Sequence, residues 1–266
     1  MKAAKKIILF TVLAISFTND TYSQSLNNGE EDFRVAEEFR KNLKPDSAII
    51  FYERAAANFE RIQDTDKLIA TYNHLGIILT RQDKYEKAKE YLDKALSRGL
   101  SSSDINSLAV ARTYISLGVV YNAWEQYEQS LKHHFKALSI RILRLGENDA
   151  EVATCYGNIG NVYLNKKEFD SSLQMHLKAM KIREKLYGKE SVEITQSYYN
   201  LGNVYREKMD YKTSIDYFQK ALENKIAQLG EKHKDLARYY KSISDVYYLM
   251  KNKQQGDLYK TKSQGI

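Results

Sequence analysis

We first consider four side chains that could support catalysis or bind a metal. His133, His134 and His176 carry imidazole rings, which are common metal ligands, and Cys155 carries a thiol. The histidines lack a carboxylate or cysteine partner at the close spacing of a metal site, and Cys155 has no sequence neighbour that marks it as a nucleophile. We therefore predict no catalytic residue, no metal site and no cofactor, and we expect Cys155 to be buried.

Asparagines offer a different chemistry, and they recur at a regular interval. Asn158 and Asn200 are 42 residues apart, and so are Asn161 and Asn203. Because an asparagine amide offers both donors and an acceptor, a row of them can pair with an extended peptide backbone whatever side chains it carries. The alternative is that these amides bond only to one another or to water on a solvated surface.

A repeat of 42 residues positions these asparagines. Its marker is a tyrosine followed four residues later by a small residue, and it occurs at Tyr72–Gly76, Tyr114–Gly118, Tyr156–Gly160, Tyr198–Gly202 and Tyr240–Ser244. A second block keeps the same period, with an aromatic residue followed ten residues later by alanine, at Tyr85–Ala95, Tyr127–Ala137, Phe169–Ala179 and Tyr211–Ala221. Internal repeats of this length are typical of solenoid proteins.

Each repeat is predicted to form two antiparallel helices. Tyr198, Leu201, Gly202 and Tyr205 lie at i, i+3, i+4 and i+7, which is one face of a helix, and a second helix starts at Tyr211. A glycine inside a helix costs about 1 kcal/mol relative to alanine. Its recurrence on the packed face therefore indicates that the partner helix approaches too closely for a larger side chain.

Composition and the joints between repeats agree with an all-α fold. The 266 residues include only 12 glycines and one proline, whereas sheet proteins need both at their turns. Glycines at the ends of second helices are predicted C-terminal caps, at Gly146, Gly188 and Gly230. Polar residues after them are predicted starts of the next helices, at Asp149, Ser191 and Asp235.

These motifs resemble the tetratricopeptide repeat (TPR). The resemblance includes a small residue in each second helix, at Ala88, Ser130, Ser172 and Ser214. The 42-residue period, longer than the family's usual 34, is similar to that of kinesin light chains and related bacterial proteins. The resemblance covers residues 29–266 and implies a right-handed superhelical solenoid of antiparallel helix pairs.

About six repeats are expected, and the first and last are degenerate. The first consists of residues 31–42 and 46–61 and lacks the Tyr–Gly marker, with Pro45 at its turn. The last ends in a weakly apolar helix, Lys253–Gln264. Solenoids need terminal repeats with a polar outer face to stay soluble, so both ends are predicted to be caps.

The resemblance also implies a binding site. In tetratricopeptide superhelices the first helix of each pair lines a concave groove, and its residues outside the core face the ligand. Carried over to this sequence, the candidate peptide-binding residues are Asn158, Asn161, Asn200, Asn203, Tyr199, Arg206, Arg238 and Lys241. The basic residues are candidates for binding a carboxylate. The lysine-rich carboxylate clamp of some relatives is incomplete, because its lysine position holds Asn73, Ile115, Gly157 and Tyr199.

The first 23 residues are predicted to be a secretory signal peptide, followed by a short linker over residues 24–28. Three lysines near the start precede an apolar stretch of eleven residues, Ile7–Phe17, and small residues at Thr21 and Ser23 favour cleavage before Gln24. A membrane-spanning helix needs about 20 apolar residues, which makes an uncleaved anchor the alternative. We expect export to the periplasm or the extracellular space, with no membrane span after cleavage.

The charge pattern bears on the partner. The formal charge is +7, and basic residues are interspersed with acidic ones, so a nucleic-acid partner is not expected. The leading hypothesis is an exported, non-enzymatic module that binds a protein or peptide in the concave groove. The alternative is a sensory or assembly subunit of an envelope signalling or secretion complex, acting through its outer faces or by self-association. Sedimentation would separate the two, because the sequence leaves the oligomeric state open.

Overall fold

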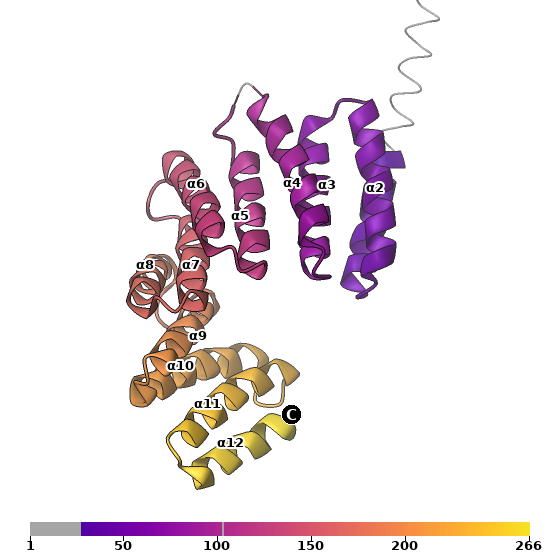
Figure 1. Cartoon of the computed structure of the whole chain (residues 1–266). Helices are drawn as coiled ribbons and strands as arrows, with labels where there is room; N and C mark the ends of the chain where they lie inside the picture. Colours follow the sequence, from indigo (N-terminus) through magenta and orange to yellow (C-terminus); the bar gives the residue numbers. More distant parts are fainter. Residues whose placement is uncertain (1–27, 103) are drawn as a thin grey trace, which may run out of the picture. The chain divides into compact units, whose positions relative to one another are not determined.

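The computed structural model describes residues 28–102 and 104–266, in which every regular element is a helix (Figure 1). This confirms the all-α prediction. The predicted signal peptide and all but the last residue of the predicted linker lie outside the described residues. Within the described part of the chain, each helix is too short or too polar to cross a membrane.

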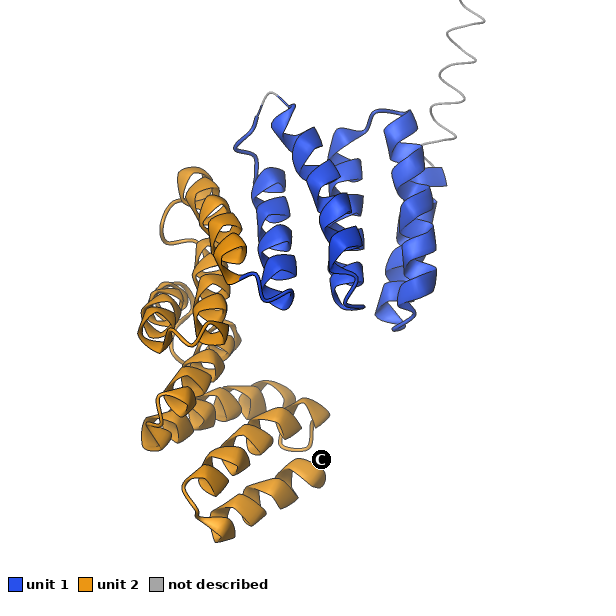
Figure 2. Cartoon of the chain, in the orientation of Figure 1, with its two compact units in different colours: residues 1–126 blue, residues 127–266 orange. Residues whose placement is uncertain are grey.

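The chain divides into two compact units, residues 1–126 and 127–266 (Figure 2). The described helices of unit 1 are a helix over residues 28–41, α2 (Pro45–Arg61), α3 (Thr65–Thr80), α4 (Tyr85–Leu100) and α5 (Leu108–Ala123). Those of unit 2 are α6 (Tyr127–Leu145), α7 (Ala150–Asn165), α8 (Phe169–Tyr187), α9 (Val192–Glu207), α10 (Tyr211–Leu229), the 3-10 helix η1 (Lys234–Leu236), α11 (Ala237–Leu249) and α12 (Lys253–Gln264). Within each unit, successive α-helices from α2 onwards pack against each other, which confirms the predicted helix pairs that lie within one unit.

Tight turns connect the two helices of a pair. In the turn between α9 and α10, Met209 has a φ of 62°, and the backbone N–H of Asp210 donates to the carbonyl oxygen of Tyr205 at 3.0 Å. The turn between α3 and α4 has the same form, with Asp83 at a φ of 57°. Such a left-handed residue closes the end of the first helix and reverses the chain within three residues.

The glycines of the repeat marker allow the helices of a pair to approach closely. A Cβ atom added to Gly76 would lie 2.6 Å from Leu92, one added to Gly160 would lie 2.7 Å from His176, and one added to Gly202 would lie 2.6 Å from Phe218. Real Cβ atoms essentially never make such short contacts. The predicted reason for the recurring glycine is therefore confirmed. We refer to the side chain that fills the space over each glycine as the knob.

A serine hydroxyl adds a polar link between paired helices of unit 2. Ser172 Oγ donates to the carbonyl oxygen of Gly160 at 2.8 Å, and Ser214 Oγ donates to that of Gly202 at 2.8 Å. Both serines are fully buried. The hydroxyl thus gives a buried helix carbonyl a second hydrogen bond across the interface.

We expect Ser214→Ala to lower the free energy of unfolding by about 1 kcal/mol, the usual net value of one hydrogen bond. Alanine fits this position, because Ala88 occupies it in α4 and is fully buried. Urea unfolding followed by circular dichroism measures the change, with Lys212→Ala on the exposed side of α10 as the control. An unchanged midpoint would show that the hydroxyl contributes nothing.

The glycines between repeats have the expected unusual backbone. The φ angles of Gly146, Gly188 and Gly230 are 81°, 86° and 79°. The ψ angles of Gly188 and Gly230 are 168° and 166°, so both are extended rather than in the left-handed helical conformation predicted for a cap. This combination is essentially restricted to glycine.

The starts of the following helices were predicted with mixed success. Asp149 is the N-cap of α7 and accepts from the backbone N–H of Glu151 at 2.7 Å. The prediction for Asp235 is wrong, because this residue lies inside η1 and α11 begins only at Ala237. The 3-10 turn brings Leu236 into the core of unit 2, where it is fully buried.

Candidate functional site

The four candidate asparagines lie on α7 and α9, which pack directly against each other. We call Asn158, Asn161, Asn200 and Asn203 the asparagine face. All four are half-buried. Asn200 Oδ1 accepts from Gln196 Nε2 at 2.7 Å. Within the described residues, the side chains of the other three make no hydrogen bond.

The asparagine face therefore offers amide groups that the fold does not use. A buried asparagine in this protein looks different: Asn73 donates to the carbonyl oxygen of Ile69 and to Thr113 Oγ1, both at 2.9 Å. Asn158, Asn161 and Asn203 keep their donors and acceptors available to solvent or to a ligand.

Tyr199 contributes mainly to the core beside this face. Its ring lies 5.3 Å from that of Phe218 and 5.4 Å from that of Tyr239, measured between centroids. The Arg238 guanidinium stacks over it at 4.9 Å, and its hydroxyl lies 3.1 Å from Ser242 Oγ. The structure thus joins Tyr199 and Arg238 in one aromatic cluster, and only part of each remains available to a ligand.

The three predicted carboxylate-binding cations already have partners. Arg206 pairs with Glu207 at 3.0 Å, and Lys241 pairs with Asp245 at 3.0 Å. Arg238 donates to the hydroxyl oxygen of its neighbour Tyr239 at 2.5 Å. Ion pairs at partly exposed sites contribute only about 0 to 1 kcal/mol. A ligand carboxylate can therefore displace Glu207 or Asp245, but neither cation is left without a partner.

His134, His176 and Cys155 lie in the packed interior of unit 2. His134 and His176 are almost fully buried, and burial lowers the pKa of each to about 4. Cys155 is fully buried, as predicted, and burial raises the pKa of its thiol. Within the described residues no group of three histidine, cysteine or acidic side chains is arranged to hold a metal ion.

Sequence reasoning missed Arg183 on α8. Its Nη1 donates to Ser197 Oγ on α9 at 2.8 Å, and its Nη2 donates to Thr154 Oγ1 on α7 at 3.3 Å. The side chain is half-buried, and burial lowers its pKa. Its position in a second helix gave no signal, because the groove candidates were taken only from first helices.

A second cluster that the sequence did not reveal lies in unit 1. Glu37 accepts hydrogen bonds from Arg40 and Tyr52, and these hold the pKa of its carboxyl at about 2, with Arg40 the larger cause. The His74 ring stacks on Tyr52 at 5.3 Å, with its Nδ1 3.4 Å from Glu37 Oε1. This cluster fixes the degenerate first helix pair to α3 without a Tyr–Gly marker.

The repeat family is decided by the sequence as a whole. A profile of the tetratricopeptide repeat matches overlapping segments at residues 39–99, 67–142, 109–185, 151–225 and 193–255. The chain belongs to the tetratricopeptide repeat family. This fold is a typical scaffold for protein–protein interaction without enzymatic activity. The sequence matches none of the curated proteins.

Solved structures share the tetratricopeptide fold at low sequence identity. BtubC (BKLC) from P. vanneervenii is 18% identical, with 92% of this chain and 89% of that chain covered, at a TM-score of 0.66. The nearly identical TPR-like repeats of a kinesin light chain-like protein from Podosopora anserina are 11% identical, covering 75% and 94%, at a TM-score of 0.63. A Rap protein complexed with competence and sporulation factor is 14% identical, covering 87% and 66%, at a TM-score of 0.68.

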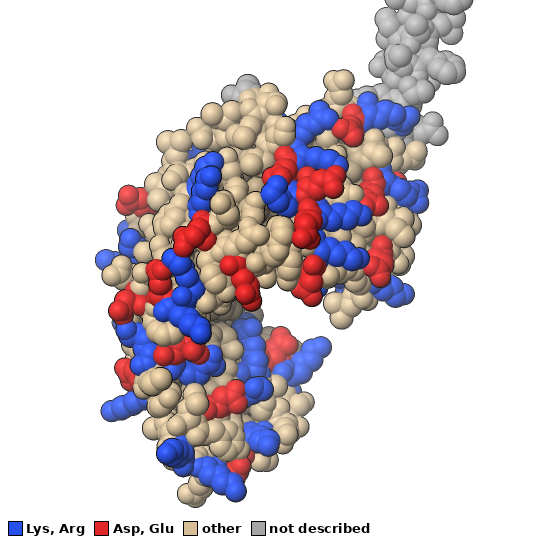
Figure 3. All heavy atoms as spheres, in the orientation of Figure 1, with Lys and Arg blue, Asp and Glu red and all other residues tan. Residues whose placement is uncertain are grey.

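The charges of this tetratricopeptide protein are mixed. On the face shown in Figure 3, basic and acidic side chains lie next to each other over both units. Many of them are neighbours on one helix, such as Lys94 and Glu90 at 2.7 Å. Such mixing is typical of a solvated helical surface rather than of a binding site for a polyanion.

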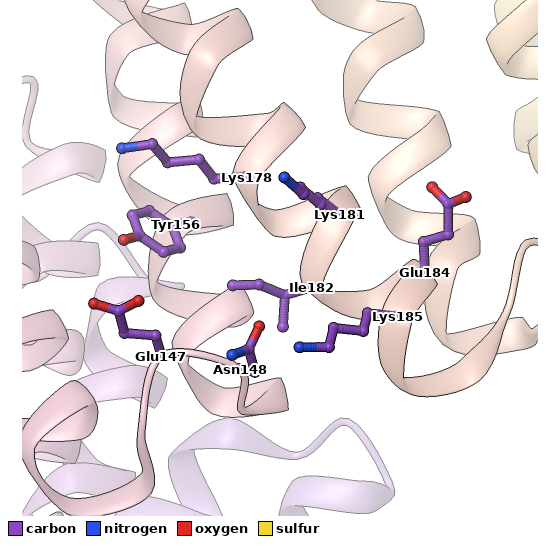
Figure 4. A pocket seen from close by; sticks show the side chains of 8 residues that line it. All are labelled: Glu147, Asn148, Tyr156, Lys178, Lys181, Ile182, Glu184 and Lys185. Atoms are coloured by element: carbon purple, nitrogen blue, oxygen red, sulfur yellow. The ribbon is translucent and has the colours of Figure 1, made fainter.

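An open hollow of about 810 Å³ lies in unit 2 of the tetratricopeptide protein (Figure 4). Lys178, Lys181 and Lys185 of α8 line it together with Tyr156 of α7 and the loop before α7. Lys178 Nζ lies 5.3 Å from the centre of the Tyr156 ring. Two glutamates also line the hollow, so its charge favours neither sign of ligand strongly.

Proposed function

We propose that this protein binds an extended peptide, or an extended segment of another protein, along the asparagine face of α7 and α9. The observation that carries the proposal is the set of unpaired amides at Asn158, Asn161 and Asn203. Each of these amides can donate to a backbone carbonyl and accept from a backbone N–H. A partner is thus held mainly through its main chain.

The mode of recognition follows from this geometry. Main-chain hydrogen bonds provide affinity that is largely independent of the partner's sequence, whereas pockets and charges beside them provide specificity. A similar fold is found in the Rap protein complexed with competence and sporulation factor, which supports a role in binding. We further propose that the protein is exported, on the strength of its lysine-rich, apolar N-terminal sequence.

The test is a quadruple variant in which all four residues of the asparagine face become alanine. We expect it to retain about one tenth of the peptide that the wild type retains, or less, because several hydrogen bonds of about 1 kcal/mol each are lost together. The measurement uses the full chain, immobilised and exposed to a pool of random eight-residue peptides, with the retained peptide quantified by mass spectrometry.

A matched control changes four exposed residues of the second helices to alanine. The residues are Gln174, Lys212, Asp216 and Glu223. This variant is expected to bind as the wild type does, and both variants should keep wild-type helicity and melting temperature. Undiminished peptide retention by the asparagine variant would rule out this face as the binding site.

A further inference from the structure

The guanidinium of Arg183 is a partly buried charge that the fold leaves without a carboxylate. It reaches between α7 and α9 and is held by two neutral hydroxyls, at Ser197 and Thr154. Within the described residues it makes no ion pair. A charge withdrawn from water is costly unless it is paired, so a half-buried arginine without a counter-ion calls for an explanation.

The preceding repeat shows how the same position is normally neutralised. Arg141 lies 42 residues before Arg183, on α6, and its Nη2 pairs with Glu151 Oε2 at 3.0 Å. The counterpart of Glu151 in the next repeat is Glu193, which is exposed and makes no ion pair within the described residues. The fold can therefore accommodate a carboxylate against this guanidinium, and at Arg183 the chain does not supply one.

Arg183 also lies at one end of the asparagine face. Its Nη2 meets the hydroxyl of Thr154, an exposed residue one turn before Asn158 and two turns before Asn161 on α7. The two hydroxyl contacts orient the guanidinium while leaving some of its N–H donors without a partner. A ligand lying along the asparagine face reaches this charge at the start of α7.

We infer that Arg183 is a carboxylate-binding residue of this face, which receives a carboxylate of the bound peptide, either its C-terminus or an acidic side chain. The inference rests on the proposed function and adds a preference to it. An arginine binds a carboxylate through a charge-assisted hydrogen bond, roughly twice as strong as a neutral one. The asparagines hold the backbone, and Arg183 selects peptides that carry a negative charge at the right end.

The experiment uses three pools of random eight-residue peptides, each acetylated at the N-terminus. One has a free C-terminal carboxylate and no acidic side chain, one has an amidated end and a single glutamate, and one has an amidated end and no acidic residue. We expect the wild-type full chain to retain one of the first two pools at least about tenfold better than the third. Which of the two is retained identifies the source of the carboxylate.

Two variants test the residue itself. Arg183→Gln removes the charge, and Thr154→Glu places an internal carboxylate beside the guanidinium while keeping Arg183 in place. Both are expected to lose the tenfold preference and still retain the neutral pool as the wild type does. Lys181→Gln, which removes an exposed charge from the same helix, should keep the preference. If Arg183→Gln does not fold, Thr154→Glu alone decides.

Each other outcome has a clear meaning. A wild-type chain that retains all three pools equally would overturn the inference and leave the proposed function standing, as would a preference that persists in either variant. A wild-type chain that retains none of the pools would overturn the proposed function and this inference with it.

Discussion

Lowering the pH from about 6.5 to about 4 is expected to destabilise this protein by several kcal/mol through His134 and His176. Burial lowers the pKa of each imidazole to about 4 in the folded state, with a smaller contribution from His133 to the first and from Arg183 to the second. In the unfolded chain a histidine has a pKa of about 6.5. One histidine shifted by this amount contributes about 3 kcal/mol.

The sign follows from which state binds the proton. Between pH 6.5 and pH 4 the unfolded chain protonates both imidazoles, whereas the folded protein keeps them neutral. The contribution of these two histidines to the free energy of unfolding is therefore full above about pH 6.5. It falls as the pH drops and changes no further below about pH 4. Glu37, with a folded pKa of about 2, loses its contribution only at lower pH, between about 4.5 and 2.

The repeat itself suggests the control for this prediction. Leu92 and Phe218 occupy the position of His134 and His176 in α4 and α10, and both are fully buried. The double variant His134→Leu and His176→Leu should therefore fold and lose most of the acid sensitivity. Urea unfolding at pH 7.5, 6, 5 and 4 measures how the free energy of unfolding of the wild type and of the double variant depends on pH. If the double variant shows the same pH dependence as the wild type, other groups cause it.

Gly160→Ala is expected to lower the free energy of unfolding by about 1 to 3 kcal/mol, the usual cost of overpacking a core. The new Cβ would lie 2.7 Å from Nε2 of His176, a knob that is 1% exposed and cannot move into solvent. Urea or thermal unfolding at pH 7.5 gives the difference. Because the clash is with one side chain, the cost should be smaller when His176 is replaced by alanine.

Gly157→Ala, in the same helix, provides the matched control with the opposite sign. Apart from the backbone of its own helix and its chain neighbours, no described atom lies within 4 Å of the Cβ that this substitution adds. Alanine is favoured over glycine inside a helix by about 1 kcal/mol, so Gly157→Ala should raise the free energy of unfolding by up to that amount. Equal effects at the two glycines would show that helix propensity, and not the knob, governs this position.

The sequence predicted the local structure closely, because the same pattern of residues recurs in successive repeats. The last helix, Lys253–Gln264, has the predicted bounds, and α10 begins at Tyr211 as expected. The failure at Asp235 arises because the chain forms a 3-10 turn, capped by His233, before α11 begins. This turn places Leu236 in the core, and that burial depends on tertiary packing, which the local sequence does not reveal.

The candidate site was harder to predict from the sequence, because it depends on which side chains form ion pairs and hydrogen bonds in the folded chain. Arginine stands at both 141 and 183, with glutamate ten residues after each. Only the structure shows that the first arginine is paired with its glutamate and the second is not. In the same way Arg206, Arg238 and Lys241 look free in the sequence, and the structure gives each of them an intramolecular partner.

The contact between each glycine and its knob has a consequence for how such a chain can be rearranged by gene duplication. The knob is leucine in α4, histidine in α8 and phenylalanine in α10, three side chains of different shape that each meet a glycine. When a helix pair is duplicated as a unit, its glycine still faces the knob that packs against it. Recombination between the two helices of a pair instead places a first helix against a knob from another repeat. We therefore expect viable insertions and deletions in this chain to preserve whole helix pairs, with breakpoints in the joints between repeats.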